Sequence, residues 1–123
     1  MIVLVTGGRD YKDIAQVNEV LTRVHKEHHI RLLVHGCATG ADTLAAIWAS
    51  VRGIQPVGCP ALWDFYSKAA GSIRNAAMLW LKPELVVAFP GGDGTANMVG
   101  QAKQAGIRVI EAVDNSDLVG GAA

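Results

Sequence analysis

The sequence lacks an excess of charge of either sign, since eleven lysines and arginines balance eleven aspartates and glutamates. A duplex nucleic-acid binder usually presents a large basic surface, so this balance argues against one. Long apolar runs are also missing, and no stretch approaches the roughly 20 residues that a helix needs to cross a bilayer. The chain starts with a strand-like run and no basic leader, so we expect a cytoplasmic protein without a signal peptide or a membrane anchor.

Cysteine is scarce too. The two cysteines, Cys37 and Cys59, form no CxxC pair, which argues against a disulfide framework or a cysteine-based zinc site. We expect both to be buried free thiols. His25, His28 and His29 cluster near the end of a predicted helix but lack a clear fourth ligand. The sequence therefore predicts no metal site and no resident cofactor.

Hydrophobic residues, in contrast, make up 50% of the chain, which is enough for a sizeable core. A chain of 123 residues with no linker, repeat or low-complexity block predicts one domain. We expect this domain to span residues 1–113. Residues 114–123 are polar and rich in glycine at their end, and we expect a loose tail.

Short apolar runs alternate with helix-like segments along the chain. The expected strands are residues 2–5, 31–35, 54–59, 85–89 and 107–110. The expected helices begin after Asp13, begin near Asp42, and cover 73–81 and 96–105. This spacing is typical of right-handed βαβ units with helices on both faces of a parallel sheet. We therefore predict an α/β fold with a mostly parallel five-stranded sheet in a three-layer α/β/α sandwich.

Apolar spacing predicts which helix faces are buried. In the first helix it selects Ile14 together with valines and a leucine that follow at helical intervals. In the second helix it selects Leu44, Ile47, Trp48 and Val51, which makes Trp48 a core residue.

The most informative stretch runs from residue 85 to residue 105. A strand expected to be buried on both faces leads into a glycine-rich turn, and a helix follows. The turn consists of Pro90, Gly91, Gly92, Asp93, Gly94 and Thr95. This layout aims backbone N–H groups and a helix N-terminus at an anion. Three glycines in four residues exceed what a plain turn needs, so we interpret the stretch as a phosphate-binding turn; a tight turn without a ligand is the alternative.

Two further glycine turns follow the first and second strands. Gly7 and Gly8 lie in one, and Gly40 and Ala41 lie in the other. The carboxyl ends of parallel strands share one edge of the sheet, so we expect all three turns to meet there and to offer phosphate donors. Asp42 either caps the second helix or binds a ribose hydroxyl.

A nucleotide site also needs positive charge and a surface for the base. Arg9, Lys68 and Arg74 are the candidate cations, with arginine favoured for bidentate phosphate contacts. Trp63 and Tyr66 lie in a segment without a clear core period. They either stack on a planar ligand or pack over a loop.

Several motifs resemble one known family. They lie in residues 6–10, 35–49, 63–71, 73–78 and 89–98. As a set they resemble the YspA-like branch of the SLOG superfamily, Rossmann-like proteins that include the cytokinin-activating LOG enzymes and the DNA-processing protein DprA. The resemblance extends to about Ile110. It implies a Rossmann-like fold and a nucleotide-derived ligand at the glycine turns, with Arg74 and Asn75 in the site. Members of this branch are often found in phages and mobile elements.

The sequence departs from the relatives at two places. LOG enzymes carry a PGGxGTxxE pattern, whose glutamate works with an arginine in cleaving an N-glycosidic bond. Here Met98 stands at the position of the glutamate, although Arg74 has a place similar to that of the arginine. Methionine cannot act as an acid or a base. The turn after the second strand has Cys37 and Thr39 where the branch usually has a further glycine and a basic residue.

Three functional hypotheses follow. The favoured one is a sensor or sequestering protein that holds a nucleotide-derived signalling molecule without turnover. The alternative is a nucleotide N-glycosidase (phosphoribohydrolase) that uses Asp42 or Asp93 in place of the missing glutamate. A DprA-like binder of single-stranded DNA is disfavoured by the neutral charge balance. We also expect a homo-oligomer, a dimer or a tetramer, because Trp80 looks exposed on an apolar helix.

Overall fold

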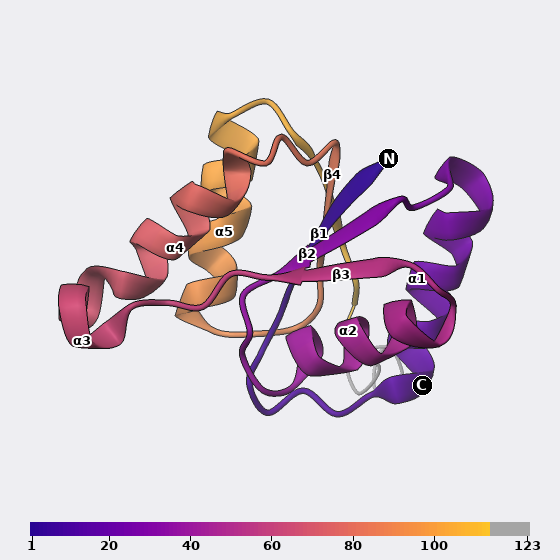
Figure 1. Ribbon diagram of the computed structural model, residues 1–123, viewed down its shortest axis with the longest axis horizontal. Coiled ribbons are helices and arrows are strands. Elements are labelled where there is room, and N and C mark those ends of the chain that lie inside the picture. The colour runs from indigo at the N-terminus through magenta and orange to yellow at the C-terminus, as the bar shows by residue number, and fades with distance from the viewer. Residues whose placement is uncertain (114–123) are drawn as a thin grey trace, which may run out of the picture.

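The computed structural model describes residues 1–113 and contains one five-stranded sheet (Figure 1). The strands are β1 (Ile2–Thr6), β2 (Leu32–His35), β3 (Gln55–Gly58), β4 (Leu85–Ala88) and β5 (Arg108–Glu111). Their order across the sheet is β3-β2-β1-β4-β5, and each pairing among them is parallel. The predicted sheet is therefore confirmed, and it is parallel throughout rather than mostly parallel.

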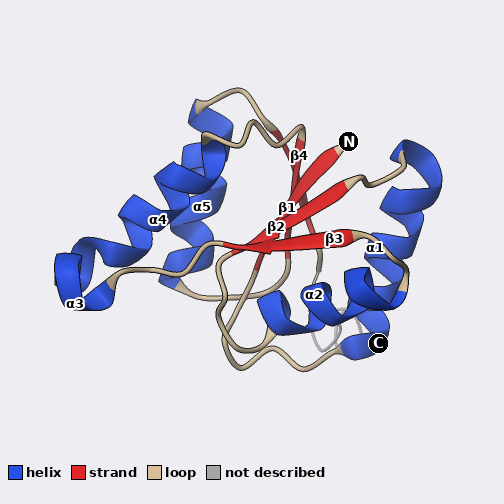
Figure 2. Ribbon diagram, in the orientation of Figure 1, coloured by secondary structure: helices blue, strands red, loops and turns tan. Residues whose placement is uncertain are grey.

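Helices cover both faces of the sheet (Figure 2). The helical segments are α1 (Ile14–His28), α2 (Ala41–Val51), α3 (Trp63–Tyr66), the 3-10 turn η1 (Ser67–Ala69), α4 (Ala70–Leu79) and α5 (Asp93–Gln104). Helices α1 and α2 pack on one face, and α4 and α5 pack on the other. This three-layer arrangement confirms the expected Rossmann-like fold.

Alternating side chains of the central strands feed two separate cores. Val3 and Val5 of β1 pack with Leu21 of α1, whereas Leu4 lies in the second core with Met78 of α4 and Met98 of α5. Strand β4 is buried along its whole length, as its unbroken apolar run predicts. The period of two in the strands thus divides the apolar residues between the two helical layers.

The predicted start of the first helix is correct, and the predicted starts of two later helices are three residues late. Helix α1 begins at Ile14, and the carboxylate of Asp13 accepts a hydrogen bond from the backbone N–H of Gln16 at 2.9 Å. Helices α4 and α5 each begin three residues before the expected start. The N–H groups in the first turn of a helix need no intrahelical partner, so residues 93–95, which include Gly94, fit there without loss of a hydrogen bond.

The predicted buried faces are wrong in part. Ile47 and Val51 are 56% and 77% exposed, and Ile14 is also exposed. Helix α2 instead buries Ala45 together with Trp48, the latter as predicted. The buried face of α2 thus combines small alanines with one large side chain, and together they fill the space against the sheet.

The predictions for the cysteines and for Trp80 can also be compared with the structure. Cys59 is half-buried, but Cys37 is exposed, so the prediction of two buried thiols is wrong for Cys37. Trp80 is exposed as expected. In the described part of the chain no helix has the length and apolar character to cross a membrane. The predicted loose tail of residues 114–123 lies outside the described residues.

Candidate functional site

The glycine turns after β1, β2 and β4 meet at the carboxyl edge of the sheet. Strand β1 lies between β2 and β4, so the chain departs from it in opposite directions, and this is where doubly wound sheets bind ligands. A Cβ atom on Gly7 would collide with the Cβ of Ala41 and lie 3.0 Å from that of Phe89. The predicted convergence of the three turns is therefore observed.

Hydrogen bonds tie these turns to one another. The N–H of Gly8 donates to the carbonyl of Pro90 at 2.9 Å, and the N–H of Ala41 donates to the carbonyl of Gly8 at 3.2 Å. Gly40 has φ of +74°, and a Cβ there would collide with the carbonyl oxygen of Gly8. Two of the expected phosphate donors, the N–H groups of Gly8 and Ala41, thus serve the protein itself. Close contact between turns, rather than ligand approach, explains glycine at 7, 8 and 40.

The N-terminus of α5 is arranged differently. Gly92 occupies the N-cap position without a side-chain cap, and the first N–H that bonds back to this turn is that of Ala96, to the Gly92 carbonyl at 3.0 Å. Asp93, Gly94 and Thr95 form the first helical turn, whose N–H groups point along the helix axis away from the helix. A Cβ on Gly92 or Gly94 would meet nothing within 4 Å. This helix end therefore offers donors and space together.

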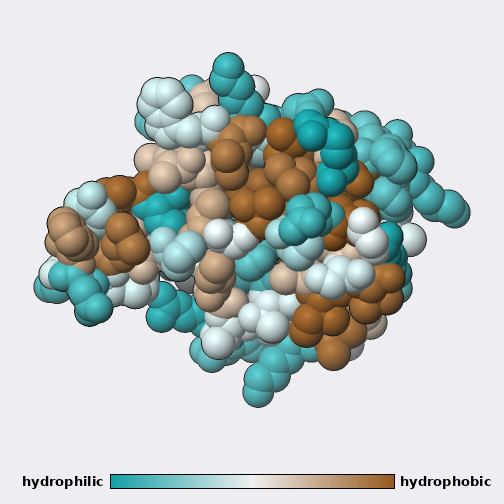
Figure 3. Space-filling model, viewed as in Figure 1, coloured by the Kyte–Doolittle hydropathy of each residue, from teal (hydrophilic) through white to brown (hydrophobic). Residues whose placement is uncertain are grey.

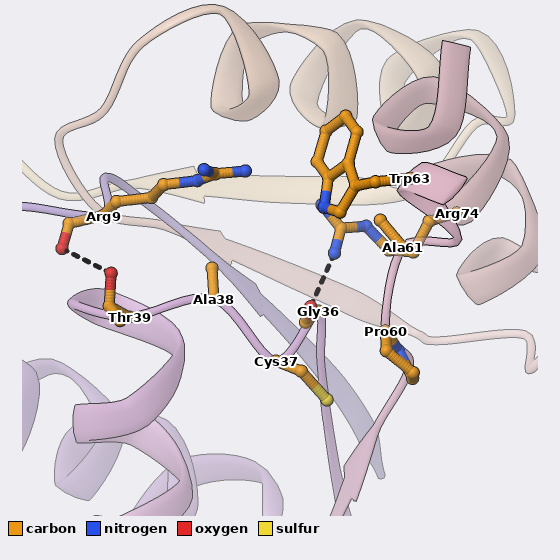
Figure 4. A pocket seen from close by; sticks show the side chains of 9 residues that line it. All are labelled: Arg9, Gly36, Cys37, Ala38, Thr39, Pro60, Ala61, Trp63 and Arg74. Carbon is orange, nitrogen blue, oxygen red and sulfur yellow. Dashed lines mark hydrogen bonds between the residues drawn. The ribbon is translucent and has the colours of Figure 1, made fainter. Parts of the chain in front are cut away.

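The α5 N-terminus opens onto a cleft made of two adjoining hollows. The first, of about 390 Å³, is lined by Thr6, Gly7, Gly8, Arg9, Ala38, Asp42, Trp63, Gly71, Arg74, Gly92, Asp93, Gly94 and Thr95. The second, of about 370 Å³, is lined by Arg9, Gly36, Cys37, Ala38, Thr39, Pro60, Ala61, Trp63 and Arg74 (Figure 4). Arg9, Ala38, Trp63 and Arg74 line both hollows, so the two form one continuous cleft.

Arg74 and Asn75 of α4 hold the two sides of this cleft. The Nη1 of Arg74 donates to the carbonyl of Gly36 at 2.6 Å (Figure 4). The Nε of Arg74 donates to the Oδ1 of Asn75 at 2.9 Å. Asn75 is 3% exposed, and its Nδ2 donates to the carbonyl of Gly94 at 3.2 Å and to Asn97 at 3.0 Å. The pair therefore fixes both the Gly36 turn and the first turn of α5.

Asp42 lies in the floor of the cleft and is almost fully buried. Its Oδ2 accepts hydrogen bonds from the N–H groups of Gly36, at 2.9 Å, and of Ala38, at 3.2 Å. The alternative that Asp42 caps α2 is wrong, because Gly40 holds the N-cap position and the carboxylate turns to the preceding loop.

The electrostatics of the floor follow from burial. Desolvation raises the pKa of Asp42, although its two N–H bonds and the charges of His35 and Arg74 oppose this shift. Desolvation also lowers the pKa of His35, against the opposing effect of Asp42. Burial thus favours the neutral form of both groups.

Of the predicted site residues in the segment 63–68, only one lines the cleft. Trp63 on α3 faces the cleft, with the guanidinium of Arg9 5.5 Å from the centre of its ring (Figure 4). Tyr66 and Lys68 lie farther along α3 and η1 and line neither hollow, and the ring of Tyr66 packs beside Phe65. The structure therefore brings Trp63 and Arg9 together but not Tyr66 and Lys68.

Some cleft residues were absent from the sequence prediction. Pro60 and Ala61 follow β3 at the same sheet edge, and that position is the signal that could have revealed them. Asn97 supports Asn75 from α5, and nothing in its local sequence indicates this. Pro90 and Gly91 lie on the far side of the third turn, where they line a separate hollow between α5 and β5.

The cleft contains groups of both charges, with Arg9 and Arg74 beside the open N-terminus of α5. Met98, at the position of the LOG glutamate, is fully buried in the second core. Asp42 and Asp93 are the carboxylates that line the described cleft. Among residues 1–113 no three His, Cys, Asp or Glu side chains are placed to hold a metal ion.

The fold and the cleft define a Rossmann-like α/β protein with a cleft at the switch point of its sheet. The chain belongs to the YspA, cpYpsA-related SLOG family, whose model matches residues 1–66. Gene 61 protein of Mycobacterium phage D29 is 36% identical to it over 116 residues, covering 88% of this chain and 93% of the phage protein.

Solved structures share the fold. The Moco carrier protein from Chlamydomonas reinhardtii superposes with a TM-score of 0.67 at 24% identity, over 89% of this chain and 74% of that protein. The structure of TM1055 gives a TM-score of 0.66 at 19% identity, over 88% and 71%. DprA from Streptococcus pneumoniae gives 0.56 at 19% identity, over 88% of this chain and 57% of that protein.

Proposed function

We propose that the cleft binds a nucleotide or a nucleotide-derived signalling molecule, and that the protein acts as a sensor or sequestering protein without turnover. The observation that carries this proposal is the N-terminus of α5. It has no side-chain cap, its Gly92 and Gly94 leave open space, and it shares a hollow with Arg9 and Arg74. A phosphate there would accept helix N–H bonds and face positive charge.

The remainder of the ligand is proposed to occupy the second hollow. Its lining by Ala38, Pro60 and Ala61 suits a flat, partly apolar group such as a base, with Trp63 at the rim. Arg74 stands at the junction of the hollows, and Arg9 reaches over the cleft toward Trp63. These contacts leave Tyr66 and Lys68 outside the proposed site.

Two features support binding without turnover. The position of the LOG glutamate holds a buried methionine, Met98, which supplies no proton transfer. The Oδ2 of Asp42 already accepts two backbone hydrogen bonds, so this oxygen is held by the loop of residues 36–38.

A nucleotide N-glycosidase is the second candidate, and one observation favours it. The raised pKa of Asp42 favours a protonated carboxyl in the cleft floor, which is the form that a general acid needs. Release of free base from a nucleoside monophosphate, lost in Asp42→Asn, would support this candidate over simple binding.

The test is a retention experiment with nucleoside monophosphates, cyclic nucleotides and ADP-ribose. The protein is incubated with the mixture and filtered, and the retained compounds are released by heat and identified by mass spectrometry. A compound recovered intact supports binding without turnover, and a compound recovered as base and sugar phosphate supports the N-glycosidase. If no compound is retained or altered, the proposal is rejected.

The site itself is tested by a matched pair of variants in α5. Gly92→Val places a side chain at the open N-terminus, whereas Gly100→Val places one at an equally open position along the helix. Blocking charge-assisted bonds worth about 1.5–3 kcal/mol should weaken retention of the compound at least tenfold in Gly92→Val. Gly100→Val should retain it within about twofold of the native protein. Equal retention by both variants would remove the α5 terminus from the site.

A further inference from the structure

One face of α4 is apolar but has no partner in the chain. The exposed residues of this face follow each other at helical intervals and are Ala69, Ile73, Ala76, Ala77 and Trp80. The opposite face buries Ala70 and Met78. Trp80 is 84% exposed, which is unusual for so large an apolar side chain. Helix α4 is therefore apolar on both sides, and only one side is covered.

This outer face also lacks charge. Between Lys68 and Lys82 the sequence has one charged residue, Arg74, and its guanidinium turns inward to the carbonyl of Gly36. The adjacent surface of α5 contributes neutral amides, with Gln101 donating to the carbonyl of Ser72 at 3.2 Å. Neutral polar groups thus border an apolar strip along the length of α4.

We propose that a second copy of this chain covers the face, with α4 packed against α4 about a twofold axis. A twofold interface brings the same patch of two copies together, so the patch must be complementary to itself. An uncharged apolar strip meets this condition, because its self-contact opposes no like charges. The three alanines allow the helices to approach closely, and tryptophan is enriched among the residues that dominate interface energy.

The aromatic side chains at the ends of the strip supply about half of the area that each partner of a standard interface buries. Trp80, Phe65 and Tyr66 at the two ends of the strip together expose on the order of 400 Å², taking about 200 Å² for a whole aromatic side chain. A standard interface buries about 800 Å² on each partner. An antiparallel pair would place Trp80 of one copy near the α3 end of the other, where the aromatic side chains lie. The alanine strip and Ile73 supply further area between these ends.

Other apolar surface is present in the described part of the chain. Figure 3 shows hydrophobic surface over the strands beside α4, over α2 and at the projecting α3. On α2, Ile47 and Val51 are exposed, but Ser50 and Arg52 are exposed beside Val51. A charged group next to an apolar pair makes self-contact costly. The α2 surface therefore serves as a control rather than as a second candidate.

Pairing through α4 is independent of the proposed ligand site. Arg74 and Asn75 face inward to the cleft, whereas Ile73 and Trp80 are exposed on the other side of the helix. A variant of the outer face can therefore lose pairing while its ligand retention is measured separately. Failure of one proposal leaves the other standing.

Sedimentation equilibrium of the full chain over a range from about 1 to 200 μM tests the pairing. The native protein is expected at twice the monomer mass at the upper concentrations. Trp80→Glu and Ile73→Glu should each weaken pairing at least about 30-fold, as expected for loss of an interface hot spot worth 2 kcal/mol or more. The matched control is Val51→Glu, which adds the same charge at an exposed apolar position of α2 and should leave the mass unchanged.

Two results would overturn the proposed pairing through α4. The proposal is overturned if the native protein remains monomeric at every concentration. This holds even if a different protein binds the α4 face. A folded Trp80→Glu and a folded Ile73→Glu that both keep the native mass overturn it as well. Circular dichroism establishes that the variants are folded, and a tetramer that these substitutions reduce to dimers would still assign one interface to α4.

Discussion

At the scale of single residues, glycine has different roles at positions that look alike in the sequence. Gly40 and Gly53 have nearly the same positive φ, +74° and +72°. A Cβ on Gly40 would collide with carbonyl oxygens of the first glycine turn, whereas a Cβ on Gly53 would meet nothing within 4 Å. Backbone strain is common to both positions, but the close contact between turns is confined to Gly40.

This pair gives a first prediction. Gly53→Ala should lower the free energy of unfolding by about 1–2 kcal/mol, the cost of a left-handed backbone for an L-residue. Gly40→Ala should lower it by at least about 2 kcal/mol more, because the added methyl group must push two turns apart. Urea unfolding of both variants provides the measurement. Equal losses would mean that the turns separate without cost.

Asp42 gives a second prediction, on pH dependence. Burial raises the pKa of its carboxyl in the folded state above the ordinary value of 3.8, so the folded state binds the proton more tightly than the unfolded state. The shift in the pKa of Asp42 therefore adds to the free energy of unfolding in full below pH 3.8. This contribution is lost as the pH rises through the folded-state pKa. Asp42→Asn keeps an oxygen for the two backbone N–H groups but does not titrate.

The measurement compares urea unfolding of the native protein and Asp42→Asn from about pH 4 to pH 7, across the usual range of carboxyl titration. As the pH rises, the free energy of unfolding of Asp42→Asn should increase relative to that of the native protein. A carboxyl carbon resonance titrating above the ordinary value would report the same shift directly. A difference that moves in favour of the native protein would mean that Arg74 and the N–H bonds outweigh burial.

At the scale of elements, the sequence identified the helices better than it identified their buried faces. Helix α2 has apolar residues on more than one side, so periodicity alone selects the large ones, Ile47 and Val51. The sheet packs instead against Ala45 and Trp48, which lie with Ala41 and Ala49 on one face of α2. The face of such a helix is decided by the fit between layers.

A third prediction follows for α2. Ile47→Gln and Val51→Gln should each change the free energy of unfolding by less than about 0.5 kcal/mol, as surface substitutions do. Ala45→Leu should lower it by about 1–3 kcal/mol, because the core at this position is already filled. Thermal and urea unfolding of the three variants check this order, and a costly Val51→Gln would contradict it.

At the scale of the whole molecule, the site depends on the order of the strands. The turns after β1 and β4 belong to segments about 80 residues apart, yet Gly8 donates to Pro90 across the switch point. Helix α4 then joins the remaining turns, because Arg74 holds the Gly36 carbonyl and Asn75 holds the Gly94 carbonyl. The cleft is thus a property of the topology, because residues from five separate segments of the chain line it.

The sequence by itself determined the alternation of five strands with helices, the parallel sheet and the family. The strands, the helices and the sheet rest on local spacing, because a strand or helix shows its period within a few residues. The family rests on the resemblance of the sequence motifs. The glycine turns, including residues 90–95, and the position of Met98 could be read in the same way, whereas a phosphate-binding role of these turns stays a prediction. The binding assignments themselves remain predictions.

Only the tertiary structure decided which groups are available for a ligand. In the folded protein the N–H groups of Gly8 and Ala41 bond to neighbouring turns, and the carboxylate of Asp42 bonds to a loop instead of capping its helix. Trp63 lines the cleft, whereas Tyr66 of the same helix does not. It also decided which face of α4 stays uncovered. The physical reason is that a hydrogen-bonding group or an apolar face is used by whatever lies nearest in space, and neighbours in space come from distant parts of the chain.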